Sequence, residues 1–140
     1  MKKKLIISLF SLLLLAFYSC TKKEKESLEQ HLKGKWGVYD KTDQNSENIL
    51  RVFVFRDDGK MYDYSSLNTS GSPDLIFDWR VENNQLKIIL IENSSGQGDP
   101  IMFPNASQGD PIMINVDEWE QGDPIMYVSL NNNSYTLKKT

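Results

Sequence analysis

The 140-residue sequence contains only one cysteine and one histidine. A single cysteine, Cys20, excludes a disulfide within the chain, so stability must come from packing. Ordinary zinc sites need several cysteine or histidine ligands, and Cys20 and His31 together cannot supply them. The pair Asp57 and Asp58 lacks the spacing of a calcium loop. We therefore expect neither a bound metal nor a cofactor.

The sequence also lacks the common catalytic signatures. It contains no Gly-x-Ser-x-Gly elbow, phosphate loop or dinucleotide fingerprint. His31 follows a charged stretch, and the sequence around it offers no candidate nucleophile or orienting acid. We therefore interpret His31 as a solvated helix residue rather than a general base. Two acidic residues brought together by folding remain an alternative route to catalysis. We predict that the protein is not an enzyme.

What the sequence does have is a beginning typical of secretion signals. Three lysines at residues 2–4 precede an uncharged apolar stretch at residues 5–17, which is shorter than the roughly 20 residues of a membrane-spanning helix. Ser19 places a small side chain directly before Cys20, and this ending resembles the lipobox of bacterial lipoproteins. We predict a signal peptide over residues 1–19 and acylation of Cys20 by chains such as palmitate. An uncleaved or soluble secreted form is the alternative.

The chain that would remain after cleavage is acidic. Without the three leading lysines the 16 basic residues fall to 13, against 19 acidic residues, a formal charge of −6. Nucleic acid is an improbable partner for such a surface, because phosphates bind proteins through lysine and arginine. Residues 20–27 would form the lipidated cysteine and a charged tether. We predict a lipoprotein of the cell envelope, anchored to the outer membrane on its periplasmic or cell-surface face.

Most of the remaining chain shows the period-two alternation typical of β-strands. Residues 51, 53 and 55 fall on one face of one such stretch, and residues 75, 77, 79 and 81 on one face of another. About eight or nine short strands are predicted, at residues 36–39, 49–55, 61–65, 75–81, 86–91, 101–103, 112–119, 125–130 and 135–138. Their close spacing leaves no room for crossover helices. This pattern favours an all-β antiparallel meander, as a barrel or a sandwich.

Turn and capping signals fit this assignment. Asp57-Asp58-Gly59 predicts a tight hairpin, and Asn83-Asn84 and Asn131 to Asn133 predict further turns, since these residues tolerate a positive φ. Ser27 followed by Gln30 three residues later predicts the capped start of a short N-terminal helix.

A resemblance to a known family rests on three segments in order. Gly34 and Trp36 form a Gly-x-Trp motif after the short helix, and residues 55–62 and 79–86 follow at the expected spacing. The chain from residue 28 to residue 140 resembles the small lipocalin-like lipoproteins of the Bacteroidetes. The resemblance implies a barrel of about eight strands. It also implies that Trp36 packs at the closed end, beneath a basic residue of the last strand, here Lys138 or Lys139.

A six-residue repeat, Gln-Gly-Asp-Pro-Ile-Met, occurs three times. The copies occupy residues 97–102, 108–113 and 121–126. Gly-Asp-Pro predicts a turn and Ile-Met the start of an extended segment. One interpretation places Asp99, Asp110 and Asp123 together at one rim as a calcium or sugar site. We favour a tandem duplication that adds loop and strand length, because successive turns of a meander alternate between its two ends.

The aromatic side chains are the remaining candidates for function. We expect Phe53, Phe55, Phe77 and Trp79 to point into the barrel and contact a ligand. An eight-stranded barrel is wide enough to hold one small ligand or to be filled by its own side chains. The leading hypothesis is a binding protein for a small apolar or amphipathic ligand. The alternative is a structural, interaction or inhibitor lipoprotein with a filled barrel that acts through its loops.

Overall fold

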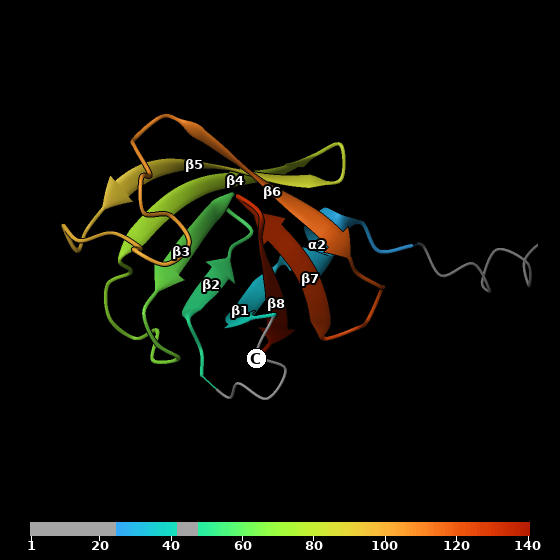
Figure 1. Cartoon of the computed structure of the whole chain (residues 1–140). Helices are drawn as coiled ribbons and strands as arrows, with labels where there is room; N and C mark the ends of the chain where they lie inside the picture. Colours follow the sequence, from blue (N-terminus) through green and yellow to red (C-terminus); the bar gives the residue numbers. More distant parts are fainter. Residues whose placement is uncertain (1–24, 42–47) are drawn as a thin grey trace, which may run out of the picture.

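The protein folds as a closed antiparallel barrel of eight strands, each hydrogen-bonded to the next in the chain, with β1 paired to β8 (Figure 1). The structure is a computed structural model that describes residues 25–41 and 48–140. The strands are β1 Gly34–Asp40, β2 Arg51–Phe55, β3 Lys60–Tyr64, β4 Leu75–Glu82, β5 Gln85–Asn93, β6 Pro111–Glu118, β7 Ile125–Leu130 and β8 Asn133–Lys139. The prediction of an all-β meander barrel is confirmed. The predicted signal peptide and Cys20 lie outside the described residues.

The barrel closes around one apolar core because every second side chain of each strand points inward. In β4, Leu75, Phe77 and Trp79 are buried while the intervening Asp78 and Arg80 are exposed. The same alternation gives β5 and β7 an inner face of aliphatic side chains and methionine. Side chains of successive strands thus meet inside the closed barrel, where burial of apolar surface supplies most of the stabilising free energy.

The turns adopt the conformations that their residues predict. Gly59 has φ of 79°, which places the β2–β3 turn in the left-handed region. The β4–β5 and β7–β8 hairpins are two-residue turns in which both central asparagines have positive φ, with values between 49° and 64°. Asparagine tolerates this conformation better than other residues with a side chain. The predicted turns at residues 57–59, 83–84 and 131–133 are therefore confirmed.

One end of the barrel is covered by the short helix α2, Leu28–Leu32 (Figure 1). Ser27 caps this helix, and the side chain of Gln30 accepts a hydrogen bond from the Ser27 amide, completing the expected capping box. Leu28 and Leu32 are buried in the core. Within the described residues, no helix is long and apolar enough to cross a membrane.

The motif tryptophan lies at this helix-covered end. Trp36 is fully buried and its indole N–H donates a 2.7 Å hydrogen bond to the carbonyl oxygen of Leu32. Lys139 Nζ lies 5.2 Å from the Trp36 ring centroid and donates to the carbonyl oxygen of His31. The basic partner expected from the resemblance is therefore Lys139, whereas Lys138 lies over Tyr39.

The interpretation of His31 as a solvated residue is wrong. Its side chain is buried between the rings of Trp36 and Trp119, with centroid distances of 5.5 and 5.0 Å, and its Nδ1 lies 3.2 Å from a Glu26 oxygen. Trp119 comes from the β6–β7 connection and folds over the helix, which sequence periodicity around His31 alone does not reveal. The imidazole is part of the packing that closes this end of the barrel.

The predicted strand at residues 101–103 is also wrong. These residues lie in the long connection between β5 and β6, which makes only an isolated bridge between Asp99 and Phe103. Met102 and Phe103 are nevertheless buried, because the connection folds back over the end of the barrel opposite α2. Their apolar character reflects insertion into the core rather than strand pairing. We call residues 99–103 the plug segment.

Candidate functional site

The end of the barrel opposite α2, which we call the mouth, is closed by the plug segment. The ring of Phe103 lies 5.9 Å from Phe53 on β2 and 5.1 Å from Phe77 on β4, measured between ring centroids. Because β3 separates these two strands, a ring that reaches both lies inside the barrel. Phe103 and the neighbouring Met102 thus fill the interior of the barrel at its mouth.

The four aromatic residues predicted to bind a ligand are brought together by the fold, as core side chains. The ring of Phe55 lies 6.3 Å from Phe53 and 5.1 Å from Trp79. All four predicted residues, including Phe77, are buried. Trp79 donates its indole N–H to the carbonyl oxygen of Arg56 near the helix-covered end, so Phe55 and Trp79 lie away from the mouth. Phe53 and Phe77 are the two that contact the plug segment.

A buried charged cluster lies beside the plug segment. Arg51 Nε donates a 2.8 Å hydrogen bond to Asp63 Oδ1, and Arg51 NH2 donates a 2.8 Å hydrogen bond to Asp74 Oδ2. Asp99 Oδ2 lies 3.2 Å from the same Arg51 Nε. Arg51, Asp63 and Asp99 are at most 4% exposed. We call the four residues Arg51, Asp63, Asp74 and Asp99 the mouth cluster.

Asp99 also shapes the plug segment locally. Its Oδ1 accepts hydrogen bonds of 2.9 Å from the amides of Ile101 and Met102, as an Asx turn does. The amide of Phe103 donates to the carbonyl oxygen of Asp99. One carboxylate therefore folds the plug segment with one oxygen and faces Arg51 with the other.

The mouth cluster holds more carboxyl groups than one arginine can neutralise. Burial raises the pKa of Asp63 well above its ordinary value, the hydrogen bond and charge of Asp99 raise it further, and Arg51 opposes both effects. Burial lowers the pKa of Arg51, but its carboxylate neighbours outweigh this and leave the pKa raised. The guanidinium therefore stays charged, and the pKa of the Asp63 carboxyl group is shifted in the direction that favours its neutral acid form.

Two oxygen atoms of the mouth cluster accept no hydrogen bond among the described residues, although one of them lies within ion-pair distance of Arg51 Nε. They are Asp63 Oδ2 and Asp99 Oδ2, and both are buried. A proton placed on Asp63 supplies an O–H that donates to Asp99 and satisfies both oxygens at once. This agrees with the raised pKa of Asp63 and with its hydrogen bond to Asp99. The surroundings of Asp63 and Asp99 are thus those of two buried carboxyl groups that are able to share one proton.

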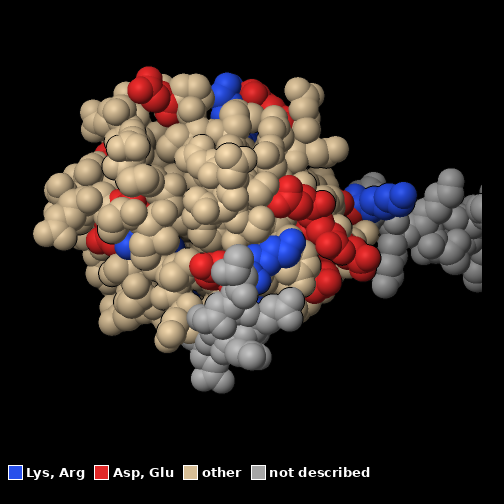
Figure 2. Space-filling view, viewed as in Figure 1, with Lys and Arg blue, Asp and Glu red and all other residues tan. Residues whose placement is uncertain are grey.

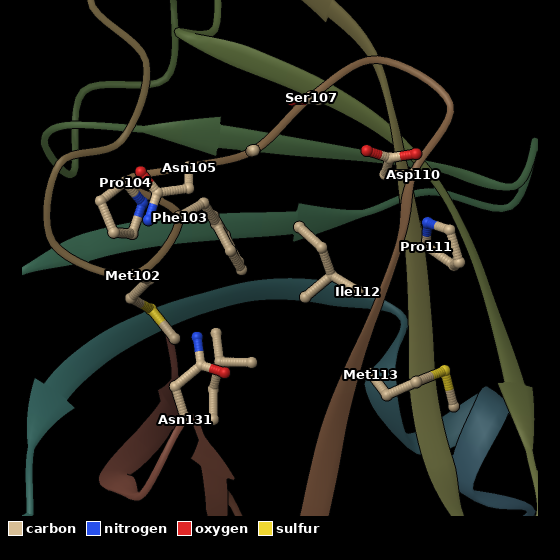
Figure 3. A pocket seen from close by; sticks show the side chains of 12 residues that line it. Met102, Phe103, Pro104, Asn105, Ser107, Asp110, Pro111, Ile112, Met113 and Asn131 are labelled. Atoms are coloured by element: carbon tan, nitrogen blue, oxygen red, sulfur yellow. The ribbon is translucent and has the colours of Figure 1, made fainter.

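A hollow of about 440 Å³ opens at the mouth between the plug segment, β6 and the β7–β8 turn. The side chains of Phe103 and Ile112 point toward one another across it (Figure 3). The lining is part apolar and part polar: Met102, Phe103, Pro104, Ala106, Ile112 and Leu130, with Asn105, Ser107, Asp110 and Asn131 among the others. Such a surface fits a small amphipathic molecule better than a purely apolar one.

Acidic side chains on the outer surface gather in one region besides Asp110, which lines this hollow. Figure 2 shows acidic side chains grouped near the end of the barrel where β6 leads into β7, and few charged groups over the upper part of the same face. Asp117, Glu118 and Glu120 are exposed in this stretch of the chain. Among the described residues, no group of three or more histidine, cysteine, aspartate or glutamate side chains is arranged to hold a metal ion.

The three copies of the repeat do not form one site. Asp99 and Asp110 lie in the β5–β6 connection, at the mouth, whereas Asp123 lies in the β6–β7 connection at the opposite end. Asp99 is buried while Asp110 is exposed. The interpretation of three aspartates at one rim is therefore wrong. The first copy does more than lengthen a loop, because it supplies the plug segment.

Sequence reasoning missed Arg51, Asp63, Asp74 and Asp99 as site residues. A signal for Arg51 was present, since it shares a strand face with Phe53 and Phe55. A charged residue on an inward face is buried only if it is paired, so the pattern already required acidic partners. Which aspartates supplied them depends on how the connections fold.

Comparison with solved structures identifies the architecture. No family model matches the chain, and no curated protein matches it. A protein from Bacteroides uniformis described as lipocalin-like superposes with a TM-score of 0.55 at 13% identity, covering 78% of this chain and 98% of that one. The fold is lipocalin-like. A second structure, an uncharacterized protein from Bacteroides eggerthii, superposes on this lipocalin-like barrel with a TM-score of 0.53 at 19% identity, covering 78% and 99% of the two chains.

Proposed function

We propose that the protein is a non-enzymatic, lipid-anchored lipoprotein of the cell envelope whose lipocalin-like barrel binds a small amphipathic ligand at its mouth. The observation that carries the ligand is the hollow of about 440 Å³, which combines apolar side chains from the plug segment and β6 with polar groups from the adjoining turns. An amphipathic molecule can place its apolar part against Phe103 and Ile112 and its polar part toward Asn105 and Asn131.

The aromatic residues predicted from the sequence enter this proposal in a modified role. Phe53 and Phe77 support the base of the site through Phe103, and Phe55 and Trp79 support the core behind them. The ligand contacts shift from these four side chains to the plug segment and β6. The basis for the shift is that Phe103 already fills the space between Phe53 and Phe77.

Ligand binding is tested by native mass spectrometry of the purified protein, which should show a co-purified small molecule, and by titration with anilinonaphthalene sulfonate as an amphipathic probe. Ala106→Trp should fill the hollow and weaken probe binding at least tenfold. Ile89→Trp is the matched control, because Ile89 lines a different hollow near the β2–β3 turn. Equal probe binding by both variants, or none by the unmodified protein, would contradict the proposal.

A second function is favoured by the same packing. The interior around Phe53, Phe77 and Phe103 is filled by side chains, which suits a structural, interaction or inhibitor lipoprotein acting through its loops. Absence of both a co-purified molecule and probe binding would support this second function.

The membrane anchor has its own test. Two or more acyl chains hold a protein stably on a bilayer. Growth of the native host with an alkyne-labelled palmitate should label the protein and place it in the outer-membrane fraction, and Cys20→Ser should abolish the label. An unmodified thiol at Cys20 in the native host would contradict the anchor and leave ligand binding to be judged separately.

A further inference from the structure

The plug segment belongs to the longest connection between strands of the described barrel. Residues 94–110 separate β5 from β6 and contain no strand of their own. Long connections without regular structure are uncommon in small domains and often cover binding sites. This one is fastened to β5 by Gly109, whose amide donates to the carbonyl oxygen of Leu90, and by Gln108, which donates to that of Ile91. The fastening leaves the plug segment as the part that enters the barrel.

Two kinds of contact hold the plug segment in place. The apolar contact joins Phe103 to Phe53 and Phe77 inside the barrel. The polar contact joins Asp99 to the mouth cluster, through its ion pair with Arg51 and a proton that it is able to share with Asp63. Only the polar contact changes with proton concentration. The two buried carboxyl groups attract one another while they share a proton and repel one another once it is lost.

The groups that face this pair come from several elements. Arg51 projects from β2 and Asp74 from the β3–β4 connection, and both are ion-paired within the mouth cluster. Tyr135 on β8 also lies near the pair. Burial raises the pKa of its hydroxyl most, and the charges of Asp40 at the end of β1 and of Asp99 raise it further. With Asp63 neutral, the cluster carries one positive and two negative charges. Loss of the shared proton would leave three negative charges against Arg51.

We propose that the plug segment is a hinged cover over the barrel mouth, latched by the proton that Asp63 and Asp99 share, and that loss of this proton releases it. Release withdraws Phe103 from Phe53 and Phe77 and opens an apolar site continuous with the hollow at the mouth. This inference goes beyond the proposed ligand binding, because release would extend the hollow at the mouth into the barrel. It stands on the mouth cluster alone and needs no ligand.

The direction of the pH effect follows from the closed state's preference for the proton. An open mouth exposes Asp63 to water, where its pKa returns toward the ordinary value, whereas closure raises that pKa. Closure therefore takes up a proton, is most favourable at low pH, and weakens as the pH rises through the raised pKa of Asp63. The ratio of open to closed protein rises by at most about tenfold per pH unit in that window, as required for one proton.

Amide hydrogen exchange of the purified protein without ligand tests the latch. The amides of Ile101, Met102 and Phe103 are hydrogen-bonded to Asp99, and the closed mouth buries Met102 and Phe103, so release exposes this segment to water. Their protection, corrected for the intrinsic pH dependence of exchange, should fall by up to about tenfold per pH unit once the pH exceeds the ordinary pKa of an aspartate, and should level off above the raised pKa of Asp63. Amides of the β4–β5 hairpin should keep their protection over the same range.

Asp63→Asn provides the decisive variant. An asparagine there can still accept from Arg51 and can donate permanently to Asp99, so the protection of the plug segment should become independent of pH. Asp99→Asn replaces the shared proton by a permanent amide donor to Asp63 and should likewise remove the fall of protection with rising pH, which decides the matter if Asp63→Asn does not fold. Asp123→Asn is the matched control, because Asp123 occupies the same place in the third repeat copy, outside the mouth cluster, and should retain the pH dependence.

Protection that is flat with pH in the unmodified protein would overturn the latch. So would an unchanged pH dependence in both Asp63→Asn and Asp99→Asn. Because the experiment contains no ligand, failure of the latch leaves the probe titrations untouched. Failure of probe binding likewise leaves the exchange result intact.

Discussion

Arg51 is the single residue on which the polar interior of the barrel depends. It contacts three carboxyl groups, of which Asp63 and Asp99 are almost completely buried. Arg51→Met keeps an unbranched apolar stem but removes the guanidinium and leaves these groups without a cation. Removing one partner of a buried ion pair typically costs about 3–5 kcal/mol, so the unfolding free energy at neutral pH should fall by that amount.

Urea denaturation measures this effect, and Arg80→Met is the control. Arg80 pairs with Glu82 on the exposed face of β4, and exposed pairs contribute about 0–1 kcal/mol. The cost of Arg51→Met should shrink at acid pH, because protonated carboxyl groups no longer need a cation. Equal costs for the two variants would show that the mouth cluster contributes no more than a surface pair.

Gly34 is required by backbone conformation and by space. Its φ is 120°, and a Cβ atom added there would lie 3.2 Å from Cε of Lys139, the residue over Trp36. Strained backbone of this kind costs about 1–3 kcal/mol, so Gly34→Ala should destabilise the protein by this amount. Gly71→Ala, with nothing within 4 Å of the added Cβ, should leave the urea midpoint nearly unchanged. If Gly34→Ala left the urea midpoint unchanged, the glycine of the Gly-x-Trp motif would not be required by the structure.

At the scale of elements, the plug segment differs from a surface loop because its apolar side chains enter the core. Phe103 is 4% exposed while Ile101, two residues earlier, is 44% exposed. Phe103→Ala should lower the unfolding free energy by about 3–5 kcal/mol at about pH 5, as expected for a buried phenylalanine. Ile101→Ala should have little effect. Denaturation of both variants under the same conditions checks this, and a small loss for Phe103→Ala would mean that the plug segment contributes little to the folded state.

The strands were predictable from sequence because period-two alternation and asparagine or glycine turns agree in most of the chain. The plug segment was not, because residues 101–103 form an apolar run too short to show any period. The three repeat copies show why a local sequence pattern is not enough to predict such a segment. Gly98, Gly109 and Gly122 all have positive φ, so the three copies share their local turn. The surroundings of each copy then decide the rest.

The methionines that end the three copies show how far those surroundings reach. Met102 and Met126 are buried, whereas Met113 is 37% exposed. In the second copy Pro111 begins β6, and Ile112 pairs with Ile88, which turns Met113 outward. Identical hexapeptides therefore place opposite faces toward the core. A local sequence pattern predicts the turn, but strand register and tertiary contacts choose the face.

At the scale of the whole molecule, the helix-covered end of the closed barrel was predictable from the sequence, whereas the mouth was not. A meander of eight short strands leaves two sheet edges, and pairing of β1 with β8 removes both. The Gly-x-Trp resemblance predicted the closed end with Lys138 or Lys139 over Trp36, and the structure shows that Lys139 takes this place. The mouth was not predictable, because Arg51, Asp63 and Asp99 meet there only after β2, β3 and the β5–β6 connection come together.

The mouth cluster should also affect the stability of the whole protein. The folded state raises the pKa of Asp63, so folding takes up a proton wherever the pH lies between the unfolded and folded pKa values of this group. Unlike most carboxylates, Asp63 therefore stabilises the fold most at low pH, and this contribution is lost as the pH rises through the raised pKa. Its slope is at most about 1.4 kcal/mol per pH unit.

The unfolding free energy of the unmodified protein minus that of Asp63→Asn isolates this contribution from all other titrations. The difference should decrease as the pH rises from the ordinary pKa of an aspartate toward the raised pKa of Asp63, with the sign set by proton uptake on folding. Asp123→Asn should show no such trend, since Asp123 lies outside the mouth cluster. A difference that increases with pH would mean that Arg51 outweighs burial and holds Asp63 as a carboxylate, in which case the shared proton is absent from the folded state.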